Sequence, residues 1–168
     1  MFISLYNNAH GEIVDYDYGC TVFVPTGNYK KEVSKQAQLL GCYFLKQLEQ
    51  AGVENQGLLM RTSEQSEKYP NGKLGDYYRV IHESIEQEIP GVIVEHVFVD
   101  NDIDVQQFLK DDNKIKKLAK ADAQAIRDYC LGTVKQEKDV EQRVTLIRDA
   151  KGKKNEYFKK TFKVYEYR

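Results

Sequence analysis

A glutamate that follows an apolar segment is the residue in this sequence best placed for acid–base chemistry. Glu95 comes directly after residues 92–94, a continuous Val-Ile-Val run typical of a strand buried on both faces of an α/β sheet. Pro90 and Gly91 mark the start of that strand. Functional residues commonly lie at the carboxyl ends of such strands, and apolar surroundings disfavour a charged carboxylate. We therefore predict that the pKa of Glu95 is raised and that it acts as a general acid or base; a solvated glutamate beyond the strand is the alternative.

The segment around Glu95 also resembles a signature of a known enzyme family. Residues 90–101 are similar to the P-x-x-[LIV]-[LIV]-E-x-x-F-[LIV]-x-N motif of the zinc-dependent N-acetylmuramoyl-L-alanine amidases, which separate the glycan of peptidoglycan from its stem peptide. Residues 2–9, Phe-Ile-Ser-Leu-Tyr-Asn-Asn-Ala, resemble the family's F-[IV]-S-[IL]-H-x-N-[AS] strand end, and residues 76–81 resemble the helix that precedes the glutamate strand. The resemblance covers roughly residues 1–132. It implies an α/β fold, with a central mixed sheet flanked by helices in three layers.

The resemblance also implies a zinc site, which this sequence does not supply. In the family, zinc activates a water molecule and polarises the amide carbonyl, while a glutamate placed as Glu95 moves the proton. Two zinc ligands come from an upstream segment with a G-H-G-G-type loop and a glutamate, and the third is a histidine at the position of Tyr6. Neither the upstream motif nor that histidine is present, so we expect zinc to be absent or substoichiometric. The resemblance suggests Asn8 and Arg61 as substrate-binding residues, with Arg61 placed to hold a peptide carboxylate through two hydrogen bonds; an exposed structural arginine is at least as good an interpretation.

Three histidines are the remaining candidates for a replacement metal site. His10 lies in a polar loop near the expected site, but surface histidines are common and we favour that interpretation. His82 lies beside an apolar helical stripe, which indicates packing or solvation more than catalysis. His96 follows Glu95 directly, so it should face the opposite side of the sheet if the strand continues.

Composition predicts a single soluble globular domain. The chain has 168 residues, of which 41% are hydrophobic, enough for a core. No apolar run approaches the roughly 20 residues of a membrane span, the first residues lack the features of a signal peptide, and no nucleic-acid motif occurs. The family resemblance nevertheless implies an extracellular or cell-wall location and peptidoglycan or a muropeptide as the partner.

The three cysteines argue against two further classes of protein. Cys20, Cys42 and Cys130 are odd in number and far apart, with no C-x-x-C pair. This spacing fits neither a disulfide framework nor a cysteine-based zinc site. We interpret them as buried thiols, with Cys42 and Cys130 on apolar helix faces.

Hydrophobic periodicity and turn residues predict an alternation of strands and helices within the amidase-like body at 1–132. Asp76 and Asp111 are placed to cap helices, and Gly52 and Gly132 to end them. The acidic stretch at 100–104 lacks the glycine and final glutamate of a calcium loop, so a turn with a helix cap is the better interpretation. The expected elements are a buried strand at 2–5, strands at 19–24 and 92–94, a short strand or extended loop at 57–62, and helices at 31–51, 76–86 and 113–130.

Composition changes after residue 132. Residues 135–168 carry 11 Lys/Arg against 6 Asp/Glu, which leaves 14 against 20 in the rest of the chain. A solvated surface explains this basic tail better than binding to an anionic polymer. Residues 133–168 are predicted to be an extension that consists of a charged linker at 135–141 and a β-hairpin. The hairpin is indicated by alternating residues at 143–148 and 157–167, joined by a turn at 149–153. A lone hairpin is marginal in water, so it must pack on the body, pair with another copy or begin a truncated module.

Two hypotheses on function follow. The first is the carboxyl-terminal portion of a cell-wall amidase domain, whose family activity is hydrolysis of the bond between N-acetylmuramic acid and L-alanine. The second is a metal-free, degenerate relative that binds peptidoglycan or a protein partner. The Glu95 motif favours the first, whereas Tyr6 and the missing ligands favour the second and predict a chain that is incomplete or inactive as it stands.

Overall fold

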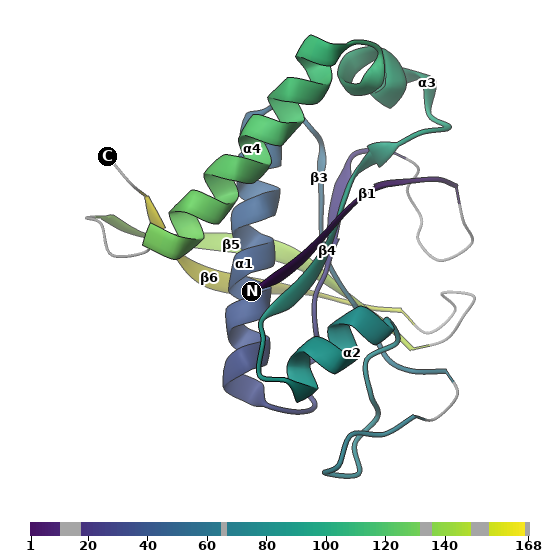
Figure 1. The fold of residues 1–168 in the computed structure, drawn as a ribbon, viewed down its shortest axis with the longest axis vertical. Helices are drawn as coiled ribbons and strands as arrows, with labels where there is room; N and C mark the ends of the chain where they lie inside the picture. Colours follow the sequence, from purple (N-terminus) through teal and green to yellow (C-terminus); the bar gives the residue numbers. More distant parts are fainter. Residues whose placement is uncertain (11–17, 65–66, 132–135, 149–154, 167–168) are drawn as a thin grey trace.

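The computed structural model describes residues 1–10, 18–64, 67–131, 136–148 and 155–166, and these build a six-stranded mixed sheet (Figure 1). The strand order is β1-β4-β2-β3-β5-β6. Neighbours run parallel in the pairs β1–β4, β2–β3 and β3–β5, and antiparallel in β2–β4 and β5–β6. The strands are β1 (Phe2–Asn8), β2 (Cys20–Phe23), β3 (Asn55–Arg61), β4 (Gly91–Phe98), β5 (Gln136–Ile147) and β6 (Glu156–Glu166).

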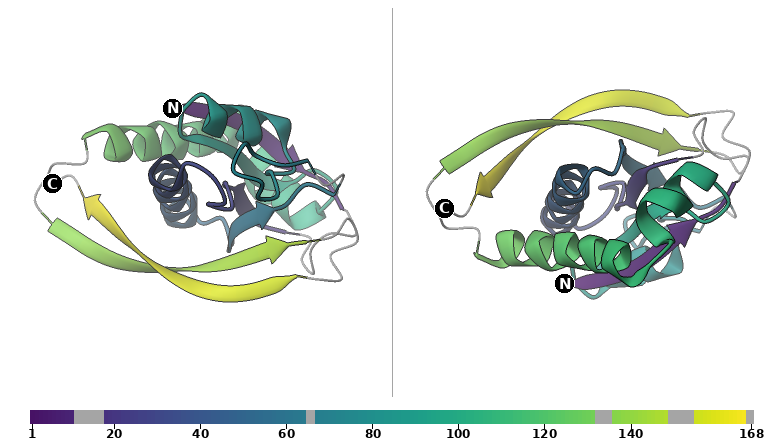
Figure 2. Two further views of the ribbon diagram at one scale, coloured as in Figure 1. Left: turned by 90° about the horizontal axis from the view of Figure 1, so that it is seen from below. Right: turned by 90° about the horizontal axis from the view of Figure 1, so that it is seen from above.

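Helices cover the sheet on two sides, which confirms the predicted three-layer α/β class. The long helices α1 (Lys31–Gln50) and α4 (Asp112–Leu131) share a large apolar core with one face. The short helix α2 (Arg79–Glu86) packs on the other face over a smaller cluster that includes Phe23, Ile81 and Ile93. Figure 2 shows α1 lying between α4 and the curved ribbon of β5 and β6. Between β4 and α4 the chain forms α3 (Asp102–Asp104) and a π-helical turn, η1 (Val105–Leu109), which the sequence did not predict.

Local sequence explains three helix ends. Helix α1 stops before Gly52, which takes the left-handed conformation (φ 89°) that a side chain would oppose. Asn101 caps α3 by accepting hydrogen bonds from the amides of Ile103 and Asp104, and Asp111 accepts from two amides at the start of α4. The predicted turn and helix cap at 100–104 and the cap at Asp111 are therefore confirmed. The predicted stop at position 132 and the turn at 149–153 lie outside the described residues.

Three predictions about local structure are wrong here. The segment expected to be a charged linker, 135–141, is strand from Gln136 onward, because β5 extends beyond the alternating residues at 143–148 to pair with β6. The strand at 2–5 was expected to be buried, but β1 is an edge strand that pairs with β4 alone among the described strands, and most of its side chains are exposed. Asp76 does not cap α2, whose N-cap position is Tyr78. The Asp76 carboxylate instead accepts hydrogen bonds from the Tyr69 hydroxyl and the Thr26 amide inside the protein.

The carboxyl-terminal ribbon packs on the body, which is one of the three arrangements that the sequence left open. Strand β5 continues the sheet by pairing in parallel with β3, with Leu58 opposite Val144. The two strands meet closely at Gly57, where φ is +97° and an added Cβ would lie 2.3 Å from the carbonyl oxygen of Arg143. A residue without a side chain is thus needed at this junction.

The cysteines are free thiols. Cys20 and Cys42 are buried in the core as predicted, whereas Cys130 is exposed near the end of α4 because it lies outside the stripe that faces α1. Burial raises the pKa of Cys42 to about 12, so this thiol is unreactive at neutral pH. None of the helices in the described ranges is long and apolar enough to cross a membrane.

Candidate functional site

A pocket of about 320 Å³ opens beside Glu95 on the α2 face of the sheet. Strand β4 is an interior strand, as predicted, but it continues to Phe98, so Glu95 lies within it and not at its end. Pairing with β1 and β2 holds the residue from both sides. Tyr6 of β1 is its register partner, and the two side chains line the same pocket. The expected approach of Tyr6 to Glu95 is confirmed. The lining residues are Ser4, Tyr6, Tyr78, Arg79, Val80, Ile93 and Glu95.

Burial gives Glu95 unusual acid–base properties. Loss of solvent raises its pKa from 4.5 to about 7, and within the described part of the chain no group donates a hydrogen bond to the carboxylate. The carboxyl group is therefore close to half-protonated at neutral pH. Such a group can both donate and accept a proton at that pH, which is the chemistry that the sequence predicted for it. Its catalytic role stays a prediction.

Two residues from the start of α2 complete the pocket, and the sequence did not single them out. Burial, and then the nearby charge of Glu95, raise the pKa of Tyr78 to about 12, so its hydroxyl stays protonated and can donate a hydrogen bond. Arg79 lies at the rim, where its guanidinium pairs with Glu83 (Nε to Oε1, 2.6 Å). In the sequence these two residues belong to the Tyr-Tyr-Arg segment at 77–79. A helix and a turn separate this segment from Glu95, so the sequence alone does not show that they lie together.

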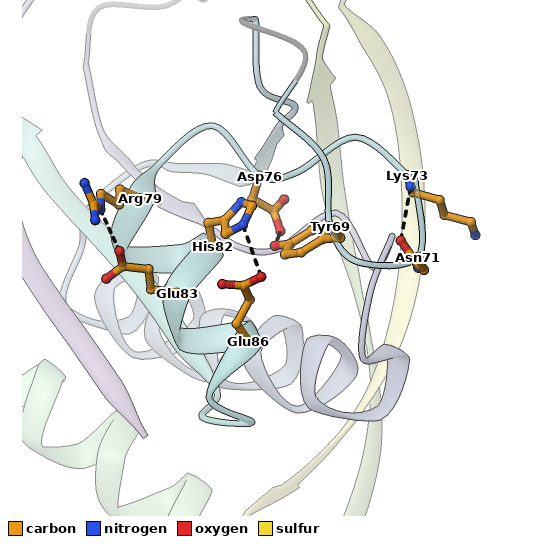
Figure 3. Close-up of polar contacts among 8 residues, drawn as sticks. All are labelled: Tyr69, Asn71, Lys73, Asp76, Arg79, His82, Glu83 and Glu86. Carbon is orange, nitrogen blue, oxygen red and sulfur yellow. Dashed lines mark hydrogen bonds and ion pairs between the residues drawn. The ribbon is translucent and has the colours of Figure 1, made fainter.

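An aromatic and acidic cluster fixes the segment that carries these two residues (Figure 3). Tyr69 stacks between Tyr29 and His82, with ring centroids 5.0 and 4.3 Å away. Its hydroxyl donates to Asp76 (2.7 Å), whose pKa is raised by burial even though the hydrogen bonds it accepts oppose that shift. His82 is 6% exposed, which confirms that it is a packing residue. The cluster joins the segment before α2 to His82 of the helix and so fixes where the helix begins.

Replacing Tyr69 with phenylalanine is expected to lower the free energy of unfolding by about 1.5–3 kcal/mol, because buried Asp76 loses a hydrogen bond to its carboxylate. Urea unfolding followed by circular dichroism measures the change. Tyr77→Phe is the matched control: its ring is 41% exposed, so a change within about 0.5 kcal/mol is expected. Equal unfolding midpoints for the two variants would show that the buried hydrogen bond does not stabilise the fold.

The three histidines lie in three different places, none of them lining the Glu95 pocket. His10 pairs with Asp100 beyond the end of β4 (2.9 Å). His82, in α2, belongs to the aromatic cluster around Tyr69. His96 lines a separate groove on the opposite face of the sheet, as its place after Glu95 predicted. No replacement site built from these side chains exists around Glu95.

The donor set in the pocket does not fit a zinc ion. A catalytic zinc site needs about three nitrogen, sulfur or carboxylate ligands. Among the residues that line the pocket, the Glu95 carboxylate is the one ligand of this kind. The other oxygen-bearing side chains of the lining are the hydroxyls of Ser4, Tyr6 and Tyr78. Among the residues that the structure describes, no group of three or more His, Cys, Asp or Glu side chains could hold a metal ion.

The two suggested substrate-binding residues lie outside the pocket lining. Arg61 is 6% exposed, forms an ion pair with Glu64 and stacks over the ring of Tyr77, 3.5 Å from its centroid. Asn8 closes the end of β1, where its side chain accepts a hydrogen bond from the amide of Ala9. Arg61 also lies 6.0 Å from the ring centroid of Tyr78, which lines the pocket. A direct contact with a ligand stays a prediction for both Arg61 and Asn8.

Comparison with known proteins identifies the fold. No protein-family model matches the sequence, and no curated protein matches it. Among solved structures, Cwp6 from Clostridium difficile matches with a TM-score of 0.54 and 20% identity, covering 76% of this chain and 17% of that one. The CwlD amidase from Clostridioides difficile, in complex with the GerS lipoprotein, matches with a TM-score of 0.54 and 21% identity (77% and 54%). The N-acetylmuramyl-L-alanine amidase Ami1 from Mycobacterium smegmatis matches at 0.50 and 16% (76% and 52%).

The chain has an amidase fold. At these identities the likeness is one of fold, and the chain spans about half the length of the two amidases. Within this amidase fold, the two segments that resemble family motifs, residues 2–9 and 90–101, lie side by side as β1 and β4. Tyr6 thus stands beside Glu95, where the resemblance places a ligand histidine.

Proposed function

We propose that this protein binds peptidoglycan fragments in the Glu95 pocket and does not, as the chain stands, hydrolyse the bond between N-acetylmuramic acid and L-alanine. The observation that carries the proposal is the pairing of Tyr6 with Glu95 in one pocket of an amidase fold, where the residues that the structure describes form no set of metal ligands. The amidase fold supports a muropeptide as the ligand, and the donor set supports binding without zinc-dependent cleavage.

The pocket chemistry suits an amide ligand. When protonated, Glu95 donates a hydrogen bond to a carbonyl oxygen, and when ionised it accepts one from an amide N–H. The Tyr78 hydroxyl supplies a second donor next to it. Ile93 and Val80 provide the apolar walls that exclude water and strengthen these hydrogen bonds.

Hydrolysis is the second candidate function, and the pKa of Glu95, about 7, is the observation that favours it. A carboxylate poised near neutral pH is suited to take a proton from an attacking water. Proton transfer alone typically contributes a factor of about 10²–10⁴, which is a small part of what amide cleavage needs. We therefore place binding ahead of catalysis.

Purified protein is expected to contain less than one zinc per chain and to release no stem peptide from muropeptides, because the pocket provides a single carboxylate ligand. Elemental analysis measures the metal, and chromatography of digested muropeptides measures cleavage. Binding of a disaccharide–tripeptide by calorimetry should be detected for the wild type and weakened in Glu95→Gln and Tyr78→Phe. Tyr77→Phe, outside the Glu95 pocket, is the control for binding.

One zinc per chain, with peptide release abolished by Glu95→Gln, would overturn this proposal and establish a working amidase. Restoring histidine through Tyr6→His is not expected to create activity, since one added ligand leaves the set incomplete. Absence of calorimetric binding with the folded protein would remove the muropeptide as its ligand. A cell-wall location follows from the proposed ligand, and the lipoprotein partner in the CwlD structure suggests testing for protein partners as well.

A further inference from the structure

Behind the Glu95 pocket, on the other face of the sheet, the described residues include a buried charged pair that joins β1 to α4. His96 of β4 is 7% exposed and so is Asp122 of α4. The Nε2 atom of His96 lies 2.9 and 3.0 Å from the two carboxylate oxygens of Asp122. Its Nδ1 atom lies 2.8 Å from the backbone carbonyl oxygen of Tyr6. One imidazole ring therefore bridges a helix and the edge strand.

The partners of this ring decide its protonation. A carbonyl oxygen and an ionised carboxylate only accept hydrogen bonds, so both ring nitrogens must carry a proton for both contacts to form. His96 is then an imidazolium paired with a carboxylate, an arrangement that makes burial of both charges tolerable. Burial lowers the pKa of His96, but the hydrogen bond and charge of Asp122, together with the Tyr6 carbonyl, outweigh it and raise the pKa overall.

The strand pairing explains why this contact is needed. From Tyr6 to Asn8, β1 advances two residues while β4 advances three, from Glu95 to Phe98, so the register shifts here. Such a bulge interrupts the regular ladder and redirects side chains. Because β1 is also the edge of the described sheet, β4 is the one described strand that pairs with its backbone at Tyr6. His96 supplies a hydrogen bond at this point.

We propose that His96 and Asp122 form a positioning clamp that fixes the β1 backbone at Tyr6 and thereby keeps the Glu95 pocket closed on its β1 side. Successive residues of a strand face opposite sides, so a bond to the Tyr6 backbone from one face sets where its side chain lies on the other. Releasing the clamp lets β1 move away and admits water to Glu95. The link to ligand binding rests on the proposed function, but the clamp itself does not.

Glu95 reports on the clamp without any ligand. Its pKa is high because water is excluded, so an opened pocket returns the pKa toward 4.5. In His96→Asn the side-chain amide takes the place of Nδ1 and can still donate to the Tyr6 carbonyl. In His96→Gln the side-chain amide takes the place of Nε2. It can still donate a hydrogen bond to the Asp122 carboxylate, but the hydrogen bond to the Tyr6 carbonyl is lost. Carbon-13 NMR titration of the glutamate carboxyls measures the pKa of Glu95 in each protein.

The expected result is a Glu95 pKa near 7 in the wild type and in His96→Asn, and at least one unit lower in His96→Gln. Val144→Ala, at a buried position of β5 outside the pocket lining, serves as a variant destabilised elsewhere and should keep the wild-type value. An unchanged pKa in His96→Gln, or an equal fall in His96→Asn or Val144→Ala, would overturn the proposal. Because this test needs no muropeptide, its failure and that of the proposed function are distinguishable.

A measurement on the wild type covers the case in which His96→Gln does not fold. Of the residues that line the groove, Asp122 of α4 is the one charged group that faces His96. The other elements around the ring contribute uncharged residues, which include Leu109 of η1 and Leu5 and Asn7 of β1. Nitrogen-15 NMR should show both ring nitrogens protonated above pH 6.5, the ordinary pKa of histidine. The Tyr6 carbonyl carbon should shift with the same midpoint as the ring. Loss of the ring proton below pH 6.5, or a Tyr6 carbonyl that does not respond, would overturn the proposal.

Discussion

Glu95→Gln is expected to stabilise the protein at pH 8 by up to roughly 3 kcal/mol and to leave its stability unchanged at pH 4. The pKa of Glu95 is raised from 4.5 to about 7 in the folded protein. Below pH 4.5 the carboxyl group is neutral in both the folded and the unfolded states. As pH rises from 4.5 to 7, the unfolded chain ionises first, so the folded protein loses about 1.4 kcal/mol for each unit of pKa difference. Glutamine has no proton to lose and escapes this loss.

Urea unfolding at pH 4, 6 and 8 measures this effect, with the difference between variant and wild type growing over that interval. Glu32→Gln is the control, since Glu32 is exposed and its ion pair with Lys35 contributes little. Parallel pH dependence in Glu95→Gln and the wild type would show that the carboxyl group is solvated, which was the alternative interpretation of the sequence. A carboxylate that opposes folding this strongly is typical of functional sites, where stability is given up for chemistry.

Gly57→Ala is expected to lower the free energy of unfolding by more than about 3 kcal/mol. The added carbon would lie 2.3 Å from the carbonyl oxygen of Arg143, in a backbone conformation (φ +97°) that already disfavours a side chain. Since the obstacle is backbone and not a flexible side chain, β3 and β5 must separate. Urea unfolding measures the loss, and hydrogen exchange should show faster exchange in β5.

Comparison with Gly72→Ala separates the effect of the close contact with Arg143 from the effect of the backbone conformation. Gly72 has a similar conformation (φ +80°), but nothing lies within 4 Å of an added carbon. Its variant should lose about 1 kcal/mol through backbone strain alone. If Gly57→Ala and Gly72→Ala are equally destabilised, the close approach of β3 and β5 is not tight, and the carboxyl-terminal ribbon is held less firmly than the pairing indicates.

Local patterns in the sequence were sufficient to predict the elements whose formation depends on neighbouring residues. The apolar run at 92–94 predicted an interior strand, and the helical spacing before Gly52 predicted α1 almost to the residue. Asp76 failed as a cap prediction because an acidic residue before a helix looks the same whether it binds the helix amides or a distant hydroxyl. The edge position of β1 could not be predicted, since composition does not say which strands stand next to one another.

The candidate site was predictable in part for the same reason. Glu95 was identified from its own neighbours in the sequence, and Tyr6 from a resemblance between motifs. Tyr78 and the His96–Asp122 pair were not, because their roles depend on contacts between segments far apart in the chain. Asp122 left one signal, a carboxylate on the apolar stripe of a helix, which indicates a buried partner even where that partner is unknown.

The order of the strands also determines when this protein can fold on the ribosome. Phe2 lies opposite Gly91, so β1 has no partner among the described strands until β4 has been synthesised. At typical translation rates that interval is on the order of ten seconds. Throughout it, an uncharged segment from Phe2 to Asn8 is free to pair with other chains, since no lysine or proline blocks it. Because β1 and β4 are far apart in the sequence, their pairing is expected to form slowly, and β1 is exposed to pairing with other chains until β4 emerges.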